Sequence, residues 1–154
     1  NGGFCLRHRR CWGWNTMARI EFGDIEALMD DLRQLGEDTE EMALEIVTEQ
    51  QDILYEAQQK TAESMLQGPY YAGDVKAGMH VKTPFSTGNG AEARITFEGT
   101  AHGNRIGEIA FINEYGKTNQ PARPFIQMAI EQEDGNLGKA ADKIVDKYLK
   151  RAGL

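Results

Sequence analysis

One long uninterrupted amphipathic segment constrains the fold of this chain more than any other feature. Residues 38–66 contain neither glycine nor proline, and their apolar side chains recur at the three- and four-residue spacing of one helix face. We therefore predict a single long helix. At 1.5 Å per residue it spans roughly 40 Å, more than the core of a small domain covers. Part of it either meets another subunit or carries a solvated acidic face.

The size and charge of the chain limit its function. Its 154 residues, 40% hydrophobic and 27% charged, suit one globular domain. With 17 basic and 24 acidic side chains the net charge is -7, which repels phosphates and anionic lipids unless basic residues gather on one face. No segment approaches the roughly 18 consecutive apolar residues of a membrane span. We expect no sequence-specific nucleic-acid partner and no membrane partner.

The first 16 residues differ from the rest. Residues 1–16 hold both cysteines, both tryptophans and a basic cluster without an acid, and the composition changes at Met17. They lack the apolar stretch of a signal peptide. Cys5, His8 and Cys11 could supply three metal ligands, but a closed zinc site needs a fourth. We interpret residues 1–16 as a non-native or disordered extension and residues 17–154 as a single domain.

The remaining elements are predicted from periodicity and breakers. An alternating tetrad at 19–22 predicts a short strand, and residues 24–35 have the spacing of a short amphipathic helix. After the long helix comes a breaker-rich loop at 68–73, and then the pattern alternates. We predict three strands there, at residues 75–82, 93–98 and 105–112.

Sequential strands usually pair antiparallel, and the glycine-rich connections at 84–90 and 99–104 are typical of exposed hairpin turns. A helix should begin at Pro124 and stop at Asp134-Gly135-Asn136, and a last helix should cover residues 137–151. The predicted fold is α+β: a long N-terminal helix packed on a small antiparallel sheet of three to four strands, with C-terminal helices.

The most distinctive motif lies at residues 111–126. It reads Phe-Ile-Asn-Glu-Tyr-Gly, a short polar spacer, and then Pro-Ala-Arg-Pro-Phe-Ile. Two prolines around two other residues hold the chain extended, deliver Phe125 into the core and let Pro124 open a helix. The loop should lie at the surface, where aromatic and arginine side chains favour interfaces. The candidate interface residues are Glu114, Tyr115, Gly116, Pro121, Ala122, Arg123, Pro124 and Phe125.

This stretch resembles the signature of the tail-completion and neck (head–tail joining) proteins of long-tailed, siphophage-type bacteriophages and prophages. A weaker match lies at residues 73–78, where Val75 replaces the usual leucine, and Ala72 precedes it where threonine is common. The order of long helix, strands and helix is also similar, so that the resemblance covers about residues 20–149. The residues before Met17 have no counterpart in that family.

The resemblance implies a structural virion-assembly protein without catalysis or cofactor. Family members are α+β domains that form a homo-oligomeric ring, here expected to be a hexamer, at the head–tail junction or tail end. The expected partners are other copies of the chain and other phage neck and tail proteins. The expected location is the virion, after assembly in the host cytoplasm.

A small metal-dependent hydrolase, or another accessory enzyme of a mobile element, is the alternative. From Met17 onward the chain has two serines, two histidines and no cysteine, which is little for a nucleophile with a positioned base. His80 and His102 could meet near Glu98 or Glu108 to bind a metal, although histidines at unrelated spacings are more often exposed polar residues. We therefore expect no catalytic or metal site.

Overall fold

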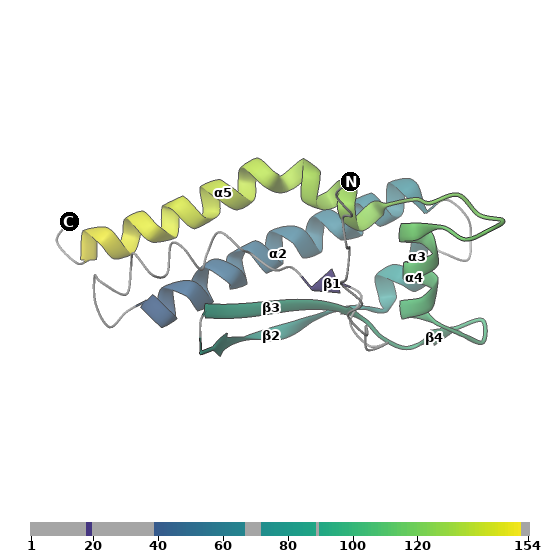
Figure 1. Ribbon diagram of the computed structural model, residues 1–154, viewed down its shortest axis with the longest axis horizontal. Helices are drawn as coiled ribbons and strands as arrows, with labels where there is room; N and C mark the ends of the chain where they lie inside the picture. The colour runs from purple at the N-terminus through teal and green to yellow at the C-terminus, as the bar shows by residue number, and fades with distance from the viewer. Residues whose placement is uncertain (1–17, 20–38, 67–71, 89, 152–154) are drawn as a thin grey trace, which may run out of the picture.

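The computed structural model describes residues 18–19, 39–66, 72–88 and 90–151. Two 27-residue helices, α2 (Thr39–Met65) and α5 (Phe125–Arg151), lie lengthwise beside each other and run in opposite directions (Figure 1). A β-hairpin of β2 (Met79–Thr87) and β3 (Gly90–Phe97) runs along α2 on its other side. The α+β class and the long helix on a small antiparallel sheet are therefore confirmed.

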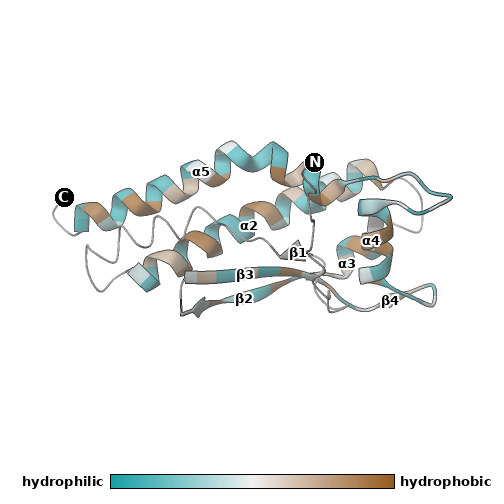
Figure 2. Ribbon diagram, viewed as in Figure 1, coloured by the Kyte–Doolittle hydropathy of each residue, from teal (hydrophilic) through white to brown (hydrophobic). Residues whose placement is uncertain are grey.

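The middle layer of the molecule is α2, which packs against α5 on one side and against the hairpin on the other. Figure 2 shows hydrophobic and hydrophilic segments alternating along both long helices, as expected for one-sided helices. Eleven α2 side chains are buried. The C-terminal half of α5 runs along the N-terminal part of α2, where Met42 and Ile46 pack with Ile144 and Tyr148. The chain itself therefore packs against α2 along the length of the helix.

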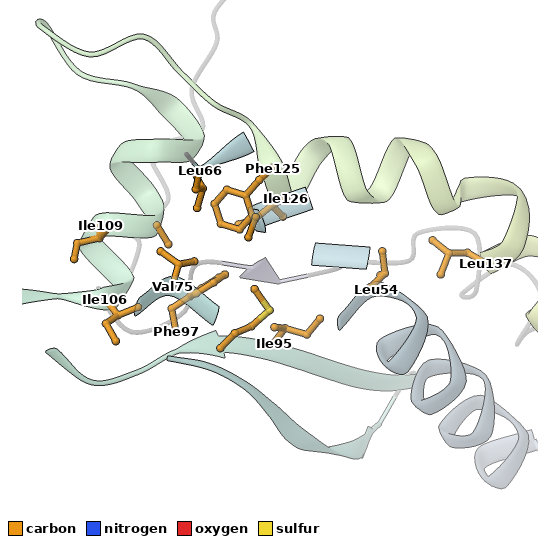
Figure 3. Close-up of a cluster of buried hydrophobic side chains, with 13 residues drawn as sticks. Leu54, Leu66, Val75, Ile95, Phe97, Ile106, Ile109, Phe125, Ile126 and Leu137 are labelled. Atoms are coloured by element: carbon orange, nitrogen blue, oxygen red, sulfur yellow. The ribbon is translucent and has the colours of Figure 1, made fainter. Parts of the chain in front are cut away.

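The main core lies where α2, the hairpin, the start of α5 and two short helices meet (Figure 3). The short helices are α3 (Ala72–Ala77) and α4 (Ile106–Tyr115). Phe125 is fully buried, and its ring packs edge-to-face on Phe97 with centroids 6.0 Å apart. Leu66 and Val75, both fully buried, complete the contact between the helices.

The sheet is antiparallel with strand order β1-β3-β2, where β1 (Ala18–Arg19) pairs with β3 opposite β2. The register of the hairpin shifts between Lys82 and Phe85. At this irregularity the side chain of Gln51 from α2 donates to the carbonyl oxygens of Lys82 and Arg94, at 3.0 and 2.7 Å. A buried amide thus satisfies one acceptor from each strand beside the bulge.

The predicted strand at 105–112 is wrong from residue 106 onward, because Ile106–Tyr115 forms helix α4. Its isoleucines favour a strand locally. Ile106, Ile109, Ala110 and Asn113 are buried, and their spacing of three, four and seven residues is that of a helix face packed on a core. Tertiary packing of this face overrides the local preference.

The predicted strand at 75–82 is wrong in its first half, because Ala72–Ala77 is helix α3 and β2 begins at Met79. Gly78 separates the two elements. A Cβ atom at this position would lie 2.6 Å from the carbonyl oxygen of Glu98, so close packing requires glycine here. The predicted loop at 68–73 is likewise wrong for residues 72–73, which are helical, and its other residues lie outside the described part.

The turn predicted at 84–90 is shorter than expected, because Pro84 and the residues up to Thr87 continue β2 beyond the bulge. Within the described sheet β2 is an edge strand, where a residue without an N–H is tolerated. The second predicted turn is confirmed. Strands β4 (Thr100–Ala101) and β5 (Asn104–Arg105) form a small hairpin whose tip has positive φ at His102 and Gly103, 52° and 79°.

The predicted break at Asp134-Gly135-Asn136 is also wrong, since α5 passes through these residues as one helix. The Asn136 side chain donates to the Glu133 carboxylate one turn earlier, at 2.6 Å. Leu137 is buried, and its carbonyl accepts a hydrogen bond from Gln50 of α2 at 3.2 Å. The first bond lies within α5, and the contacts of Leu137 hold the helix against α2 two residues after the glycine.

Several predictions fall on residues outside the described ranges. They concern residues 1–16, most of the strand at 19–22, the helix at 24–35, and Asn89 of the hairpin turn. No described helix is long and apolar enough to cross a membrane.

Candidate assembly surface at the α4–α5 corner

The signature stretch, residues 111–126, forms a corner made of the end of α4, a tight turn and the start of α5 (Figure 1). Gly116 ends α4 with φ 76°, and its N–H donates to Ile112 at 2.8 Å. A Cβ at Gly116 would lie 2.8 Å from the amide nitrogen of Ala122. Both its conformation and the close approach of the returning chain require glycine.

Asn113 fixes the returning chain to α4. Its side chain is almost fully buried and donates to the Ile109 carbonyl at 2.8 Å. Its side-chain oxygen accepts from Gln120 at 3.2 Å, and its backbone carbonyl accepts the Arg123 N–H at 2.6 Å. The turn is therefore held by side-chain and main-chain bonds from one residue of α4.

Glu114 joins the two helices. Its carboxylate accepts the backbone N–H of Ile126 at 2.9 Å and that of Gln127 at 3.0 Å, one on each oxygen. The N–H of Phe125 donates to Arg123 and that of Met128 to Pro124. All of the first four amides of α5, which cannot find partners within the helix, are thereby satisfied. A negative charge at this end also interacts favourably with the helix dipole.

The structure divides the predicted interface residues into two groups. The expectation that Phe125 enters the core is confirmed, since it is fully buried, whereas the expectation that Glu114 lies at the surface is wrong, since it is 7% exposed. Tyr115, Pro121 and Ala122 are exposed, while Gly116, Arg123 and Pro124 are partly buried. The buried members build the corner, and the exposed ones face solvent.

Phe111 is an exposed residue that sequence reasoning did not single out. Its side chain is 49% exposed and that of Tyr115 is 61% exposed, and the two rings lie 4.8 Å apart, tilted by 47°. They are four residues apart and therefore adjacent on one face of α4. The signal was present in this spacing, but the strand prediction placed the residues on an extended segment.

We call Glu108, Phe111 and Tyr115 the α4 stripe. They are exposed and follow the three- and four-residue spacing of one helix face. The buried residues of α4 occupy the opposite side of the helix. The stripe therefore points away from the core, on an element that the Glu114 cap and the Asn113 bonds hold in place.

The candidate metal ligands do not gather at one place. His102 Nε2 lies 3.2 Å from Asp74 of α3, whereas Glu98 forms an ion pair with Lys82 on the hairpin. The hydrogen bond from Lys82, a second one from Thr96 and the nearby His80 lower the pKa of Glu98. Among the residues that the structure describes, no three histidine, cysteine, aspartate or glutamate side chains meet to hold a metal ion.

Comparison with known proteins adds no family to this geometry. No protein-family model, curated protein or solved structure matches the chain.

Proposed function

We propose that this protein is a structural subunit of the head–tail junction or tail end of a siphophage-type virion or prophage. The observation that carries the proposal is the α4 stripe, whose two aromatic side chains are 49% and 61% exposed. Both aromatic residues belong to the stretch whose sequence resembles the neck-protein signature. The buried part of that stretch keeps the exposed part in a fixed orientation.

The rigidity of the corner supports a role in assembly. Asn113, Glu114 and Gly116 each bond or pack against the returning chain, so that little conformational entropy remains to be lost when a partner docks. Tyrosine, phenylalanine and arginine are enriched in protein interfaces. A pre-organised aromatic surface on a small domain suits a subunit with permanent neighbours.

Deletion of the gene from the phage or prophage that encodes it tests the proposal. Electron micrographs of the lysate should show heads and tails that fail to join, or tails of abnormal length. The wild-type gene in trans should restore virions, and a Phe111→Ser/Tyr115→Ser copy should not. Normal infectious virions without the gene would rule out the proposed role, and a stoichiometric metal in a purified monomer would favour the hydrolase alternative.

A further inference from the structure

We infer that the outer face of the C-terminal half of α5 binds the phosphate backbone of duplex DNA without sequence preference. The binding surface is the lysine row, which we define as Lys139, Lys143 and Lys150. This inference does not depend on the proposed assembly role, because the row lies on a different element from the α4 stripe. It follows from the placement and the free charges of these three side chains.

Charge is separated along α5. Residues 125–138 carry three acidic side chains and no basic one, whereas residues 139–151 carry five basic and two acidic side chains, a net charge of +3. The whole chain has a net charge of -7, which repels phosphates unless basic residues gather on one face. The C-terminal half of α5 meets this condition.

The lysine row is the outermost ridge of the helix. At 3.6 residues per turn its three members lie within about 40° of one another around the helix axis, and at 1.5 Å per residue they span roughly 16 Å along it. All three are exposed, while Ile144 and Tyr148 are buried on the opposite side, against α2. This half of α5 lies on the side of α2 away from the hairpin (Figure 1). The row therefore presents three cations in a line.

The charges of the lysine row are free to bind an anion. Among the residues that the structure describes, none of the three lysines forms an ion pair or a side-chain hydrogen bond. Lys147, on the flank next to α2, differs because its ammonium group donates to both carboxylate oxygens of Glu45, at 2.6 and 2.8 Å. This bond lowers the pKa of Glu45 and neutralises that carboxylate of α2.

Two aspartates flank the row on its other side. Asp142 and Asp146 line the same open hollow as the lysines. Neither forms an ion pair with another residue in the described part of the chain. They weaken the attraction for phosphate at a distance without neutralising a lysine, so their removal should strengthen DNA binding.

Stabilisation of the helix C-terminus does not account for the lysine row. Cations interact favourably with the helix dipole within the last turn, where Lys150 and Arg151 lie. Lys139 and Lys143 lie more than two turns before the end of α5, too far for this effect. Their alignment with Lys150 on one ridge therefore needs a different explanation.

A nucleic-acid backbone suits the row better than a membrane surface does. Helices that bind at membrane surfaces combine cations with exposed apolar side chains, and none of the exposed large hydrophobic side chains of the described chain lies in residues 139–151. Duplex DNA carries a negative charge for about every 1.7 Å of its axis, so that phosphates can face the whole row. Phosphate contacts read no bases, which makes the binding independent of sequence.

The affinity of the full chain for short labelled DNA duplexes, measured by fluorescence anisotropy at several salt concentrations, tests this inference. Duplexes of unrelated sequence should bind equally. The logarithm of the wild-type affinity should fall with the logarithm of the salt concentration, with a slope of about 2–3 for three phosphate contacts. Lys139→Gln/Lys143→Gln/Lys150→Gln should weaken binding about ten-fold or more and flatten this slope.

The matched control is Lys60→Gln/Arg105→Gln/Lys117→Gln, which removes three positive charges from exposed positions on other parts of the chain. Because salt screens distant charges, it should stay within about two-fold of the wild-type affinity. Asp142→Asn/Asp146→Asn should bind DNA more tightly than the wild type. All of these side chains are exposed, so the melting midpoints of the variants should change little.

Three results would overturn the inference. The first is a wild-type chain that does not bind duplex DNA at low salt. The second is an equal loss of affinity in the two triple variants, which would make binding a matter of net charge. The third is binding of phosphatidylserine vesicles in place of DNA. None of them bears on the virion role, which the gene-deletion experiment decides.

Discussion

At the scale of single residues, the signature glutamate has a different role from the one its sequence context suggests. Glutamate beside an exposed tyrosine in a loop-forming motif predicts a surface contact, but Glu114 is buried and accepts two amides of α5. The sequence contains no local sign of this, because a cap supplied from 12 residues upstream depends on how the two helices cross. The neighbouring Tyr115 carries the exposed part of the motif.

Replacing Glu114 with glutamine should destabilise the monomer. Glutamine retains one acceptor and turns an N–H₂ toward the other amide, so one charge-assisted bond is lost, at a cost of about 1–3 kcal/mol. The free energy of unfolding from urea titration measures this loss. Tyr115→Ser is the control and should leave it within about 0.5 kcal/mol. An unchanged stability in Glu114→Gln would mean that the cap contributes nothing.

Two buried glutamines on α2 should respond in opposite ways to the same substitution. Gln51 bonds to both strands at the bulge, so Gln51→Met leaves two carbonyls without this donor and should cost about 1–3 kcal/mol. Gln58 is fully buried, and neither polar atom of its side chain has a hydrogen-bond partner in the described structure. Methionine is similar in length and apolar, so Gln58→Met should stabilise the protein by about 1–3 kcal/mol.

Thermal and urea unfolding of both variants, measured side by side, test whether the two changes in stability have opposite signs. The comparison is matched, because both variants replace a glutamine of α2 with methionine. A loss of stability in Gln58→Met equal to that in Gln51→Met would show that the Gln58 amide makes bonds of comparable worth.

At the scale of elements, the sequence predicts α2 and the hairpin well, divides α5 into two helices where the structure has one, and predicts the short helices poorly. The glycine- and proline-free run that forms α2 extends over seven turns, so that its periodicity is unambiguous. In α4 only ten residues carry the pattern, and the isoleucines within it favour strands locally. Packing with Phe97 and Val75 decides for the helix. Phe97 ends β3, before the small β4–β5 hairpin, and Val75 lies in α3, before the β2–β3 hairpin.

A substitution at Gly135 tests whether α5 is continuous at this residue or is broken there. No atom lies within 4 Å of a Cβ added at Gly135, and the residue is exposed inside the helix. Gly135→Ala should therefore stabilise the protein by about 0.5–1 kcal/mol. Chemical denaturation measures this gain. A destabilised variant would mean that the chain needs a glycine conformation at this position, as the sequence-based prediction assumed.

The contact between the start of α2 and the end of α5 should make the free energy of unfolding depend on pH. The Tyr148 hydroxyl donates to the Glu45 carboxylate at 3.1 Å, and burial together with this bond raises the pKa of Tyr148 to about 12 from 10.0. Its contribution to stability is therefore complete below pH 10 and is lost as the pH rises toward 12.

Over that interval the unfolding free energy of the wild type should fall more steeply than that of Tyr148→Phe, which has no proton to lose. Urea titrations of both proteins at pH 9 to 12 compare the slopes. Parallel curves would contradict the raised pKa of Tyr148. Lysine titration is common to both proteins and cancels in the comparison.

At the scale of the whole molecule, α2 is the central layer, with α5 and the hairpin on either side and α4 at one end (Figure 1). The sequence predicts the long helix on a small antiparallel sheet, because the pattern of the helix is long and one-sided. It does not predict which surfaces remain free, since this depends on how α5 and the hairpin cover α2. Of the two possibilities for α2, contact with another subunit or a solvated acidic face, the structure shows packing against α5 and the hairpin, and the exposed aromatic residues lie on the α4 stripe.

The most direct measurement of the central claim is the mass of the purified full-length chain across a concentration series, by light scattering or native mass spectrometry. The account predicts that the wild type associates beyond a dimer and that Phe111→Ser/Tyr115→Ser remains a folded monomer with an unchanged melting midpoint. Association of that variant to the same mass as the wild type would contradict the claim that the α4 stripe is an assembly surface.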